Sequence, residues 1–195
     1  MNKLRDFQSF IYSSSFNVIA IVETWLSPFI SDNEILPTGF AIYCKDRKSH
    51  GGGVLFTIHL SLPSCQLQSP PDLEVAAVQI GVKGNVVICV VYIPPTADKS
   101  YYLKQLDYLS FILDKYQTLI LGDFNFPDIC WSTLSGQPIS SRAICNLAFH
   151  HDLSQLVNFP THISGNTLDL ILSPSTFIVP DLKSVSYPSL KSQIT

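Results

Sequence analysis

The sequence predicts an α/β fold of the α+β or mixed layered kind, because apolar segments of strand length greatly outnumber segments with helical periodicity. Strand-like runs occupy residues 17–23, 40–44, 54–60, 73–82, 86–92, 118–121, 168–172 and 182–185. Helical spacing of apolar side chains occurs in residues 3–15, 100–116 and 140–151. The 13 prolines and nine glycines also favour short elements joined by many turns.

Turn-forming residues delimit the predicted strands. Residues 17–23 contain Val-Ile-Ala-Ile-Val and end in a glutamate. Three glycines at 51–53 allow the chain to bend between the second and third strands. Lys-Gly-Asn at 83–85 predicts a hairpin turn before the β-branched strand that follows. Pro94 and Pro95 end that strand, because proline cannot donate a hydrogen bond to a neighbouring strand.

The three helices are predicted from apolar residues three and four positions apart, which place one apolar stripe on each helix. Residues 3–15 give the first helix and residues 100–116 a longer second one. A third helix is expected over residues 140–151, with Ser140 or Ser141 as a candidate N-terminal cap. No repeat or low-complexity linker interrupts this pattern, so residues 1–195 are expected to form one domain.

Composition narrows the possible classes of protein. Hydrophobic residues make up 46% of the chain and charged residues 14%, which excludes general disorder. The formal net charge of −3 argues against a dedicated non-specific nucleic-acid binder, but not against an enzyme that recruits cations to meet phosphates. Five cysteines, an odd number without a Cys-x-x-Cys pair, argue against a zinc site and a disulfide framework. No secretory signal or membrane-spanning run is visible, so a soluble intracellular protein is expected.

The most informative motif is Leu-Ile-Leu-Gly-Asp-Phe-Asn at residues 119–125, where a buried strand ends in polar side chains. If extended geometry continues, Asp123 and Asn125 leave the same face of the sheet. A carboxylate and a carboxamide placed together can hold a polarised water or a phosphate oxygen. The alternative interpretation is an ordinary turn, which Gly, Asp and Asn all favour.

Other polar residues also follow apolar strands, and they are expected to meet at one end of a sheet. Glu23 has apolar flanks, and a partly buried carboxylate of this kind suits an oxygen ligand of Mg²⁺. Tyr92 is either an amphipathic residue at a strand end or a phenol directed at a phosphate. Asp169 interrupts an apolar strand and needs a partner, for which a catalytic histidine is suited. His162 is a weaker candidate, in a loop that faces either solvent or substrate.

Five motifs occur together in this order: Glu-Thr-Trp-Leu at 23–26, Gly-Gly-Gly-Val at 51–54, Val-Tyr-Ile-Pro-Pro at 91–95, Leu-Gly-Asp-Phe-Asn at 121–125 and Leu-Asp-Leu-Ile-Leu at 168–172. In order and spacing they resemble the endonuclease/exonuclease/phosphatase family. Phe-Pro-Asp-Ile-Cys-Trp at 126–131 and Phe-Pro-Thr-His at 159–162 resemble one branch, the endonuclease domain of non-LTR (LINE-type) retrotransposons. The resemblance covers nearly the whole chain.

The resemblance implies a four-layer α/β sandwich of two mixed β-sheets flanked by helices, and Mg²⁺-dependent (or Mn²⁺-dependent) hydrolysis of a DNA phosphodiester. Position by position, Glu23 resembles the family's metal ligand, and Asp123 resembles the residue that orients or deprotonates the attacking water. Asn125 resembles the neighbouring residue that binds phosphate, and Tyr92 resembles the tyrosine near the scissile phosphate. Asp169 resembles the partner of the catalytic histidine. It also implies a reverse transcriptase domain downstream in a complete element, and access to the nucleus.

Both ends depart from the family pattern. A first strand bearing an asparagine is expected before residue 3 and is absent, and the sequence Ser-Leu-Lys-Ser at 189–192 leads to Gln-Ile-Thr instead of the family's Ser-Asp-His. The domain is therefore expected to be incomplete at both termini, without its first strand and last catalytic loop, and impaired as a nuclease. Two alternatives remain: a catalytically inert remnant or binding module, and a phosphatase or exonuclease on the same scaffold.

Overall fold

The computed structural model describes residues 2–26, 29–36, 38–47, 51–81, 86–177 and 182–183. Its elements follow one another as α1 (Asn2–Ser13), β1 (Val18–Val22), α2 (Asp32–Ile35), β2 (Phe40–Lys45), β3 (Val54–His59), β4 (Ser64–Gln66), β5 (Val75–Ile80), β6 (Val86–Tyr92), α3 (Lys99–Leu113), β7 (Gln117–Asp123), α4 (Ile139–His150), β8 (Leu153–Gln155) and β9 (Asp169–Pro174). Among the helices of this described part, none is long and apolar enough to cross a membrane.

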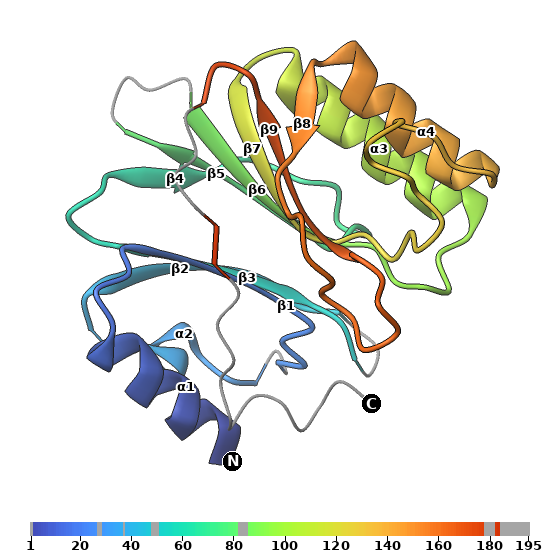
Figure 1. Ribbon diagram of the computed structural model, residues 1–195. Helices are drawn as coiled ribbons and strands as arrows, with labels where there is room; N and C mark the ends of the chain where they lie inside the picture. The colour runs from blue at the N-terminus through green and yellow to red at the C-terminus, as the bar shows by residue number, and fades with distance from the viewer. Residues whose placement is uncertain are drawn as a thin grey trace.

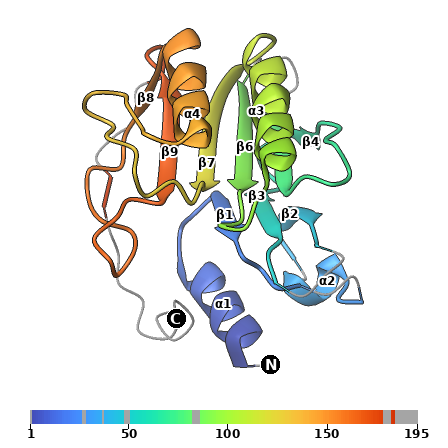
Figure 2. The same ribbon diagram turned by 90° about the vertical axis from the view of Figure 1, so that its right-hand side faces the viewer.

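These elements form four layers (Figure 1). A three-stranded antiparallel sheet, in the order β1-β3-β2, packs against a six-stranded sheet, in the order β4-β5-β6-β7-β9-β8. The larger sheet is mixed, because β6 and β7 run parallel while its other neighbours are antiparallel. Helices α3 and α4 cover its outer face, as Figure 2 shows, and α1 and α2 cover the smaller sheet. The expected sandwich is confirmed, although the smaller sheet is antiparallel in its described strands.

The apolar layer between the two sheets follows from the two-residue period of the strands. In β3, Val54, Phe56 and Ile58 face the larger sheet, while Leu55 faces the helices on the other side. In β6, Val90 and Tyr92 face the smaller sheet. Residues on both faces of β3 are buried, so the strand appears in the sequence as a largely apolar run, broken only by Thr57 and the terminal His59.

Most predicted elements match their observed bounds to within a few residues, and β6 coincides with the predicted strand at 86–92. The predicted caps of α4 are wrong: its N-cap is Pro138, and the Ser141 hydroxyl instead donates to Asp128 Oδ1 at 2.7 Å. Three short elements, α2, β4 and β8, were not predicted, because three or four residues carry little periodic signal. The predicted turn at 83–85 lies outside the described residues. So do positions 184–185 of the last predicted strand, whereas residues 182 and 183 belong to no strand.

Gly122 is the residue on which the pairing of β6 with β7 depends. It has a φ of 143° and lies opposite Val91 in the parallel register. A Cβ atom added at this position would lie 1.8 Å from the Val91 carbonyl oxygen. The glycine therefore permits a close approach of two backbones directly before the Asp123 position.

We expect Gly122→Ala to lower the free energy of unfolding by about 3 kcal/mol or more, since overpacking adds to backbone strain. Gly39→Ala is the matched control: Gly39 also has a positive φ, of 86°, but among the described residues no atom beyond its two chain neighbours lies within 4 Å of its added Cβ. It should cost only about 1–2 kcal/mol. Urea denaturation of both variants measures the difference, and equal losses would show that β6 and β7 do not need the close approach.

Candidate functional site

Three polar side chains lie in one row across the larger sheet. Tyr92 at the end of β6 is the register partner of Asp123 on β7, and Asp123 is the partner of Asp169 on β9. Directly opposed residues on neighbouring strands point to the same face of a sheet. Because Tyr92 packs in the layer between the sheets, the two aspartates face the same layer at its edge. The expected gathering of these residues at one end of the sheet is therefore observed.

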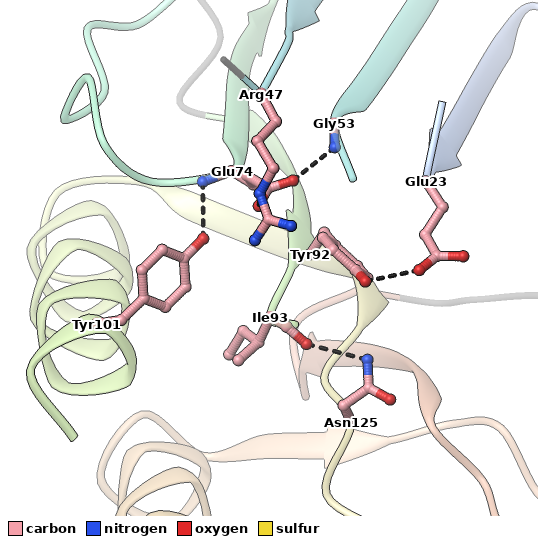
Figure 3. A network of polar contacts seen from close by, with 8 residues as sticks. All are labelled: Glu23, Arg47, Gly53, Glu74, Tyr92, Ile93, Tyr101 and Asn125. Atoms are coloured by element: carbon pink, nitrogen blue, oxygen red, sulfur yellow. Dashed lines mark hydrogen bonds and ion pairs between the residues drawn. The ribbon is translucent and has the colours of Figure 1, made fainter. Parts of the chain in front are cut away.

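Glu23 reaches this row from the smaller sheet. It directly follows β1, and the Tyr92 hydroxyl donates a 2.6 Å hydrogen bond to Glu23 Oε1 (Figure 3). The Tyr92 side chain is 4% exposed, so its ring belongs to the core while its oxygen reaches the site. Burial, followed by the Glu23 carboxylate, raises the pKa of the Tyr92 phenol well above its usual value. The phenol therefore remains a hydrogen-bond donor at neutral pH.

Asp123 and Asn125 form a compact hydrogen-bonded pair. The backbone N–H of Asn125 donates to Asp123 Oδ1 at 3.0 Å, and its side-chain Nδ2 donates to Asp123 Oδ2 at 2.9 Å. Nδ2 also donates to the Ile93 carbonyl at 3.0 Å. Asn125 has a φ of 53°, so the extended geometry on which the same-face arrangement depended does not continue, and the turn that was the alternative is observed. The chain turns after β7, and this turn brings the carboxamide back onto the carboxylate.

Negative charge accumulates at this end of the sheet. Burial, and next the Asp169 carboxylate, raise the pKa of Asp123 to about 7, against the opposing hydrogen bonds from Asn125. The pKa of Asp169 is also raised, first by desolvation and further by Glu23, although the Thr161 hydroxyl and His162 act in the opposite direction. Carboxylates that raise the pKa of a neighbouring carboxyl form a place where a cation is stabilised.

The predicted histidine partner of Asp169 is not found among the described residues. The Asp169 backbone N–H donates to Thr161 Oγ1 at 3.0 Å, which fixes the start of β9. His162 lies in the loop before β9, where its Nδ1 shares a 2.6 Å hydrogen bond with Ser164 Oγ. Residues 184–195, which include the near-match to the family's last motif, lie outside the described residues.

Glu74 is a site residue that the sequence analysis missed. It precedes β5, is 5% exposed, and accepts a 2.5 Å hydrogen bond from the Gly53 N–H. Its Oε1 lies 2.9 Å from Arg47 Nε in an ion pair. A carboxylate between two buried apolar residues, Leu73 and Val75, was the available signal in the sequence.

The chemistry of the donor set fits a weakly held, hydrated divalent cation. The described residues contain no group of three His, Cys, Asp or Glu side chains arranged to hold a metal ion. Mg²⁺, however, is commonly held by one or two carboxylates while it keeps several waters. Glu23 has one carboxylate oxygen bonded to Tyr92, and it contributes to the raised pKa values of Asp123 and Asp169. Glu23 is the residue best placed to hold such an ion.

The fold is shared with solved enzymes of low sequence identity. One is the 3′ phosphatase NExo from Neisseria in complex with a product DNA hairpin, with a TM-score of 0.65, 12% identity, and coverage of 89% of this chain and 82% of that one. Another is the endonuclease domain of TRAS1, a telomere-specific non-LTR retrotransposon, with a TM-score of 0.62, 13% identity, and coverage of 89% and 77%. An AP endonuclease from Archaeoglobus fulgidus gives a TM-score of 0.54, 13% identity, and coverage of 87% and 80%.

The architecture is thus shared with a 3′ phosphatase and with a retrotransposon endonuclease domain. The sequence model of the endonuclease-reverse transcriptase family matches residues 86–191, more than half of the chain. The chain belongs to this family. A comparison of the sequence with curated proteins found no match.

The raised pKa of Asp123 predicts a pH-dependent stability. The folded protein keeps a proton that the unfolded chain releases near pH 4, so this contribution to the free energy of unfolding is present below about pH 4 and lost as the pH rises toward 7. Asp123→Asn should remove part of this decline, because the amide does not ionise. Urea denaturation between about pH 5 and about pH 8 measures both slopes. Identical slopes would show that Asp123 ionises as freely in the fold as in the unfolded chain.

Proposed function

We propose that the chain is the DNA endonuclease domain of a non-LTR (LINE-type) retrotransposon, which nicks target DNA by metal-dependent hydrolysis of a phosphodiester. The observation that carries the proposal is the meeting of Glu23 with Tyr92 beside the hydrogen-bonded Asp123–Asn125 pair. The two pairs come from both sheets and from widely separated segments of the chain. Membership of the endonuclease-reverse transcriptase family supports the same activity.

The roles follow from the contacts of each side chain. Glu23 would hold Mg²⁺ or Mn²⁺, which when bound would supply positive charge against the negative charge that develops on a phosphate undergoing hydrolysis. Asp123 orients the attacking water and accepts its proton, for which a pKa of about 7 is suited. Tyr92 keeps its proton, and its hydroxyl fixes Glu23 and lies close to the phosphate.

Asn125 acts first on Asp123. Both hydrogens of its Nδ2 are engaged, one by Asp123 Oδ2 and one by the Ile93 carbonyl. A contact between Asn125 and a phosphate oxygen therefore requires the exchange of one of these bonds. His162 is proposed as a DNA contact from the loop before β9, where it stands near enough to Asp169 to affect its pKa.

We propose that the activity of these 195 residues is impaired. Within the described part of the chain, no imidazole hydrogen-bonds Asp169, so the group that should protonate or stabilise the leaving oxygen is not in place there. An inert remnant that only binds DNA is the first alternative. A phosphatase or exonuclease is the second, favoured by the fold shared with the 3′ phosphatase.

The extent of the domain, its downstream neighbour and its DNA target are further parts of the proposed function. Residues 1–195 are taken as one domain of this type, and a reverse transcriptase domain is expected downstream in a complete element, in keeping with the family's description. Target-site nicking would require access to nuclear DNA. DNA binding at the site would be driven by the phosphate backbone, with the cation offsetting the acidic side chains.

Glu23→Gln should weaken Mg²⁺ and Mn²⁺ binding, since the amide removes the charge that attracts a hard cation. Isothermal titration calorimetry should show weak binding for the wild type and a loss of about tenfold or more for the variant. Glu34→Gln is the matched control, because Glu34 lies in the exposed cap of α2. Equal affinities of wild type and Glu23→Gln would remove Glu23 from the metal site.

Supercoiled plasmid in Mg²⁺ tests the activity. The wild-type polypeptide should nick the plasmid about 10⁴-fold more slowly than an intact enzyme does. Catalytic groups that act together do not retain proportional shares of the rate when one of them is lost. Asp123→Ala should abolish whatever nicking is seen. Rapid nicking that Asp123→Ala abolishes would contradict the impairment, and equal traces in both would favour the inert remnant. Release of phosphate from a 3′-phosphorylated oligonucleotide without nicking would favour the phosphatase.

A further inference from the structure

The hydrogen bond between Tyr92 and Glu23 joins two segments of the chain, and contacts with other residues hold each segment in place. Glu23 has a φ of 53°, a backbone conformation that is unfavourable for a residue with a side chain. Trp25, two residues later, has a φ of 52°. Such a segment persists only where surrounding contacts determine it. Residues outside the segment must therefore supply those contacts.

The contacts to this segment come from the glycines at the start of β3. The Trp25 N–H donates to the Gly52 carbonyl at 3.0 Å, and the Thr24 N–H donates to the Gly53 carbonyl at 3.4 Å. Gly52 and Gly53 themselves have φ values of 73° and 90°. The glycine segment therefore holds Glu23 from its C-terminal side, and it needs support of its own.

Glu74 supplies that support. Its carboxylate accepts the Gly53 N–H at 2.5 Å, as Figure 3 shows. Its backbone carbonyl accepts the Tyr92 N–H at 3.0 Å, and its own N–H donates to the Tyr101 hydroxyl at 3.1 Å. One buried residue thus contacts both the segment that holds Glu23 and the backbone of Tyr92.

These bonds close a ring. It runs from the Glu74 carboxylate through the glycine segment to Glu23, across to the Tyr92 hydroxyl, and back along Tyr92 to the Glu74 carbonyl. We propose that Glu74 is a positioning residue, which sets the place of the Glu23 carboxylate relative to Tyr92. This inference deepens the proposed function and depends on it only for the statement that Glu23 holds the metal ion.

The contacts distinguish this role from that of a metal ligand. Oε2 of Glu74 accepts the hydrogen bond from the Gly53 N–H, and Oε1 lies 2.9 Å from Arg47 Nε in an ion pair. The Arg47 ion pair supplies the countercharge that a carboxylate with 5% exposure needs. The Arg47 side chain is 30% exposed, whereas the hydrogen bond from the Gly53 N–H to Glu74 is buried.

Adjacent glycines offer a matched test. A Cβ at Gly52 would lie 2.3 Å from Glu74 Oε2, whereas the nearest described atom to a Cβ at Gly51 would belong to the Trp25 ring, at 3.8 Å. Both glycines have a positive φ, of 73° and 88°, so both alanine variants carry comparable backbone strain. Only Gly52→Ala displaces the Glu74 carboxylate. Glu74→Met removes the acceptor while keeping the length of the side chain, and Glu74→Gln keeps an acceptor oxygen for the Gly53 N–H.

The readouts are amide hydrogen exchange at Thr24 and Trp25 and calorimetric Mn²⁺ affinity of the full chain. Gly52→Ala and Glu74→Met should speed exchange by about tenfold or more, because the Gly53 N–H loses its acceptor on Glu74. They should weaken Mn²⁺ binding by about 10-fold to 100-fold. Gly51→Ala and Glu74→Gln should stay close to the wild type in both measurements. If Gly52→Ala fails to fold, Glu74→Met against Glu74→Gln gives the same contrast.

Equal behaviour of the two glycine variants, and of the two Glu74 variants, would overturn the proposal. Faster exchange confined to Gly53, with Thr24 and Trp25 unchanged, would also overturn it, since Glu74 would then support only the glycine segment. Failure of the wild type to bind Mn²⁺ would refute the metal-dependent function. The exchange rates would still decide the role of Glu74, because they are measured without the ion.

Discussion

The packing of two sheets on one apolar layer is the constraint that places the side chains of the candidate site. Strand alternation assigns Val54, Phe56 and Val90 to this layer, and Tyr92 is its last member at one edge. The Tyr92 ring contributes to the core, while its hydroxyl bonds Glu23 across the gap between the sheets. The same residue therefore serves stability and geometry, so the site cannot form unless the sheets pack in this register. If the two sheets moved apart, Glu23 on the smaller sheet would separate from Tyr92, Asp123 and Asp169 on the larger one. The pairing of those three residues within the larger sheet would remain.

The edge of this layer also opposes folding electrostatically. Burial and the Asp169 carboxylate raise the pKa of Asp123 to about 7, and desolvation and Glu23 raise that of Asp169. A group whose charged form is disfavoured in the fold lowers stability when it ionises. Only Glu74 is matched by a close cation among the four carboxylates of the described site, through Arg47. An arrangement that is unfavourable by itself but favourable around a cation is typical of a binding site and uncommon in a purely structural network.

The sequence was informative where a pattern is repeated over many residues. Alternation and helical spacing predicted the main strands and helices. The polar residues at the ends of the strands Val18–Val22, Val86–Tyr92 and Gln117–Asp123 predicted the location of the candidate site. Contacts between distant segments were not accessible in this way. The carboxylate of Glu74 is separated from Gly53 by 21 positions, and nothing in either local sequence specifies the other. Asn125 was misjudged for a related reason, since a single residue with positive φ ends the extended geometry on which the expectation depended.

The positions that specify the site differ in kind from those that specify the layers. An apolar layer tolerates many side chains of similar volume, which explains how a TM-score of 0.62 to the TRAS1 domain accompanies 13% identity. Gly122 and Gly52 have no such latitude, because an added Cβ would lie 1.8 Å from the Val91 carbonyl oxygen or 2.3 Å from Glu74 Oε2. Each of these glycines stands beside a functional group, Asp123 in one case and the segment that holds Glu23 in the other. The motifs that indicated the family, Gly-Gly-Gly-Val and Leu-Gly-Asp-Phe-Asn, are therefore the places where backbone geometry and chemistry restrict the sequence together.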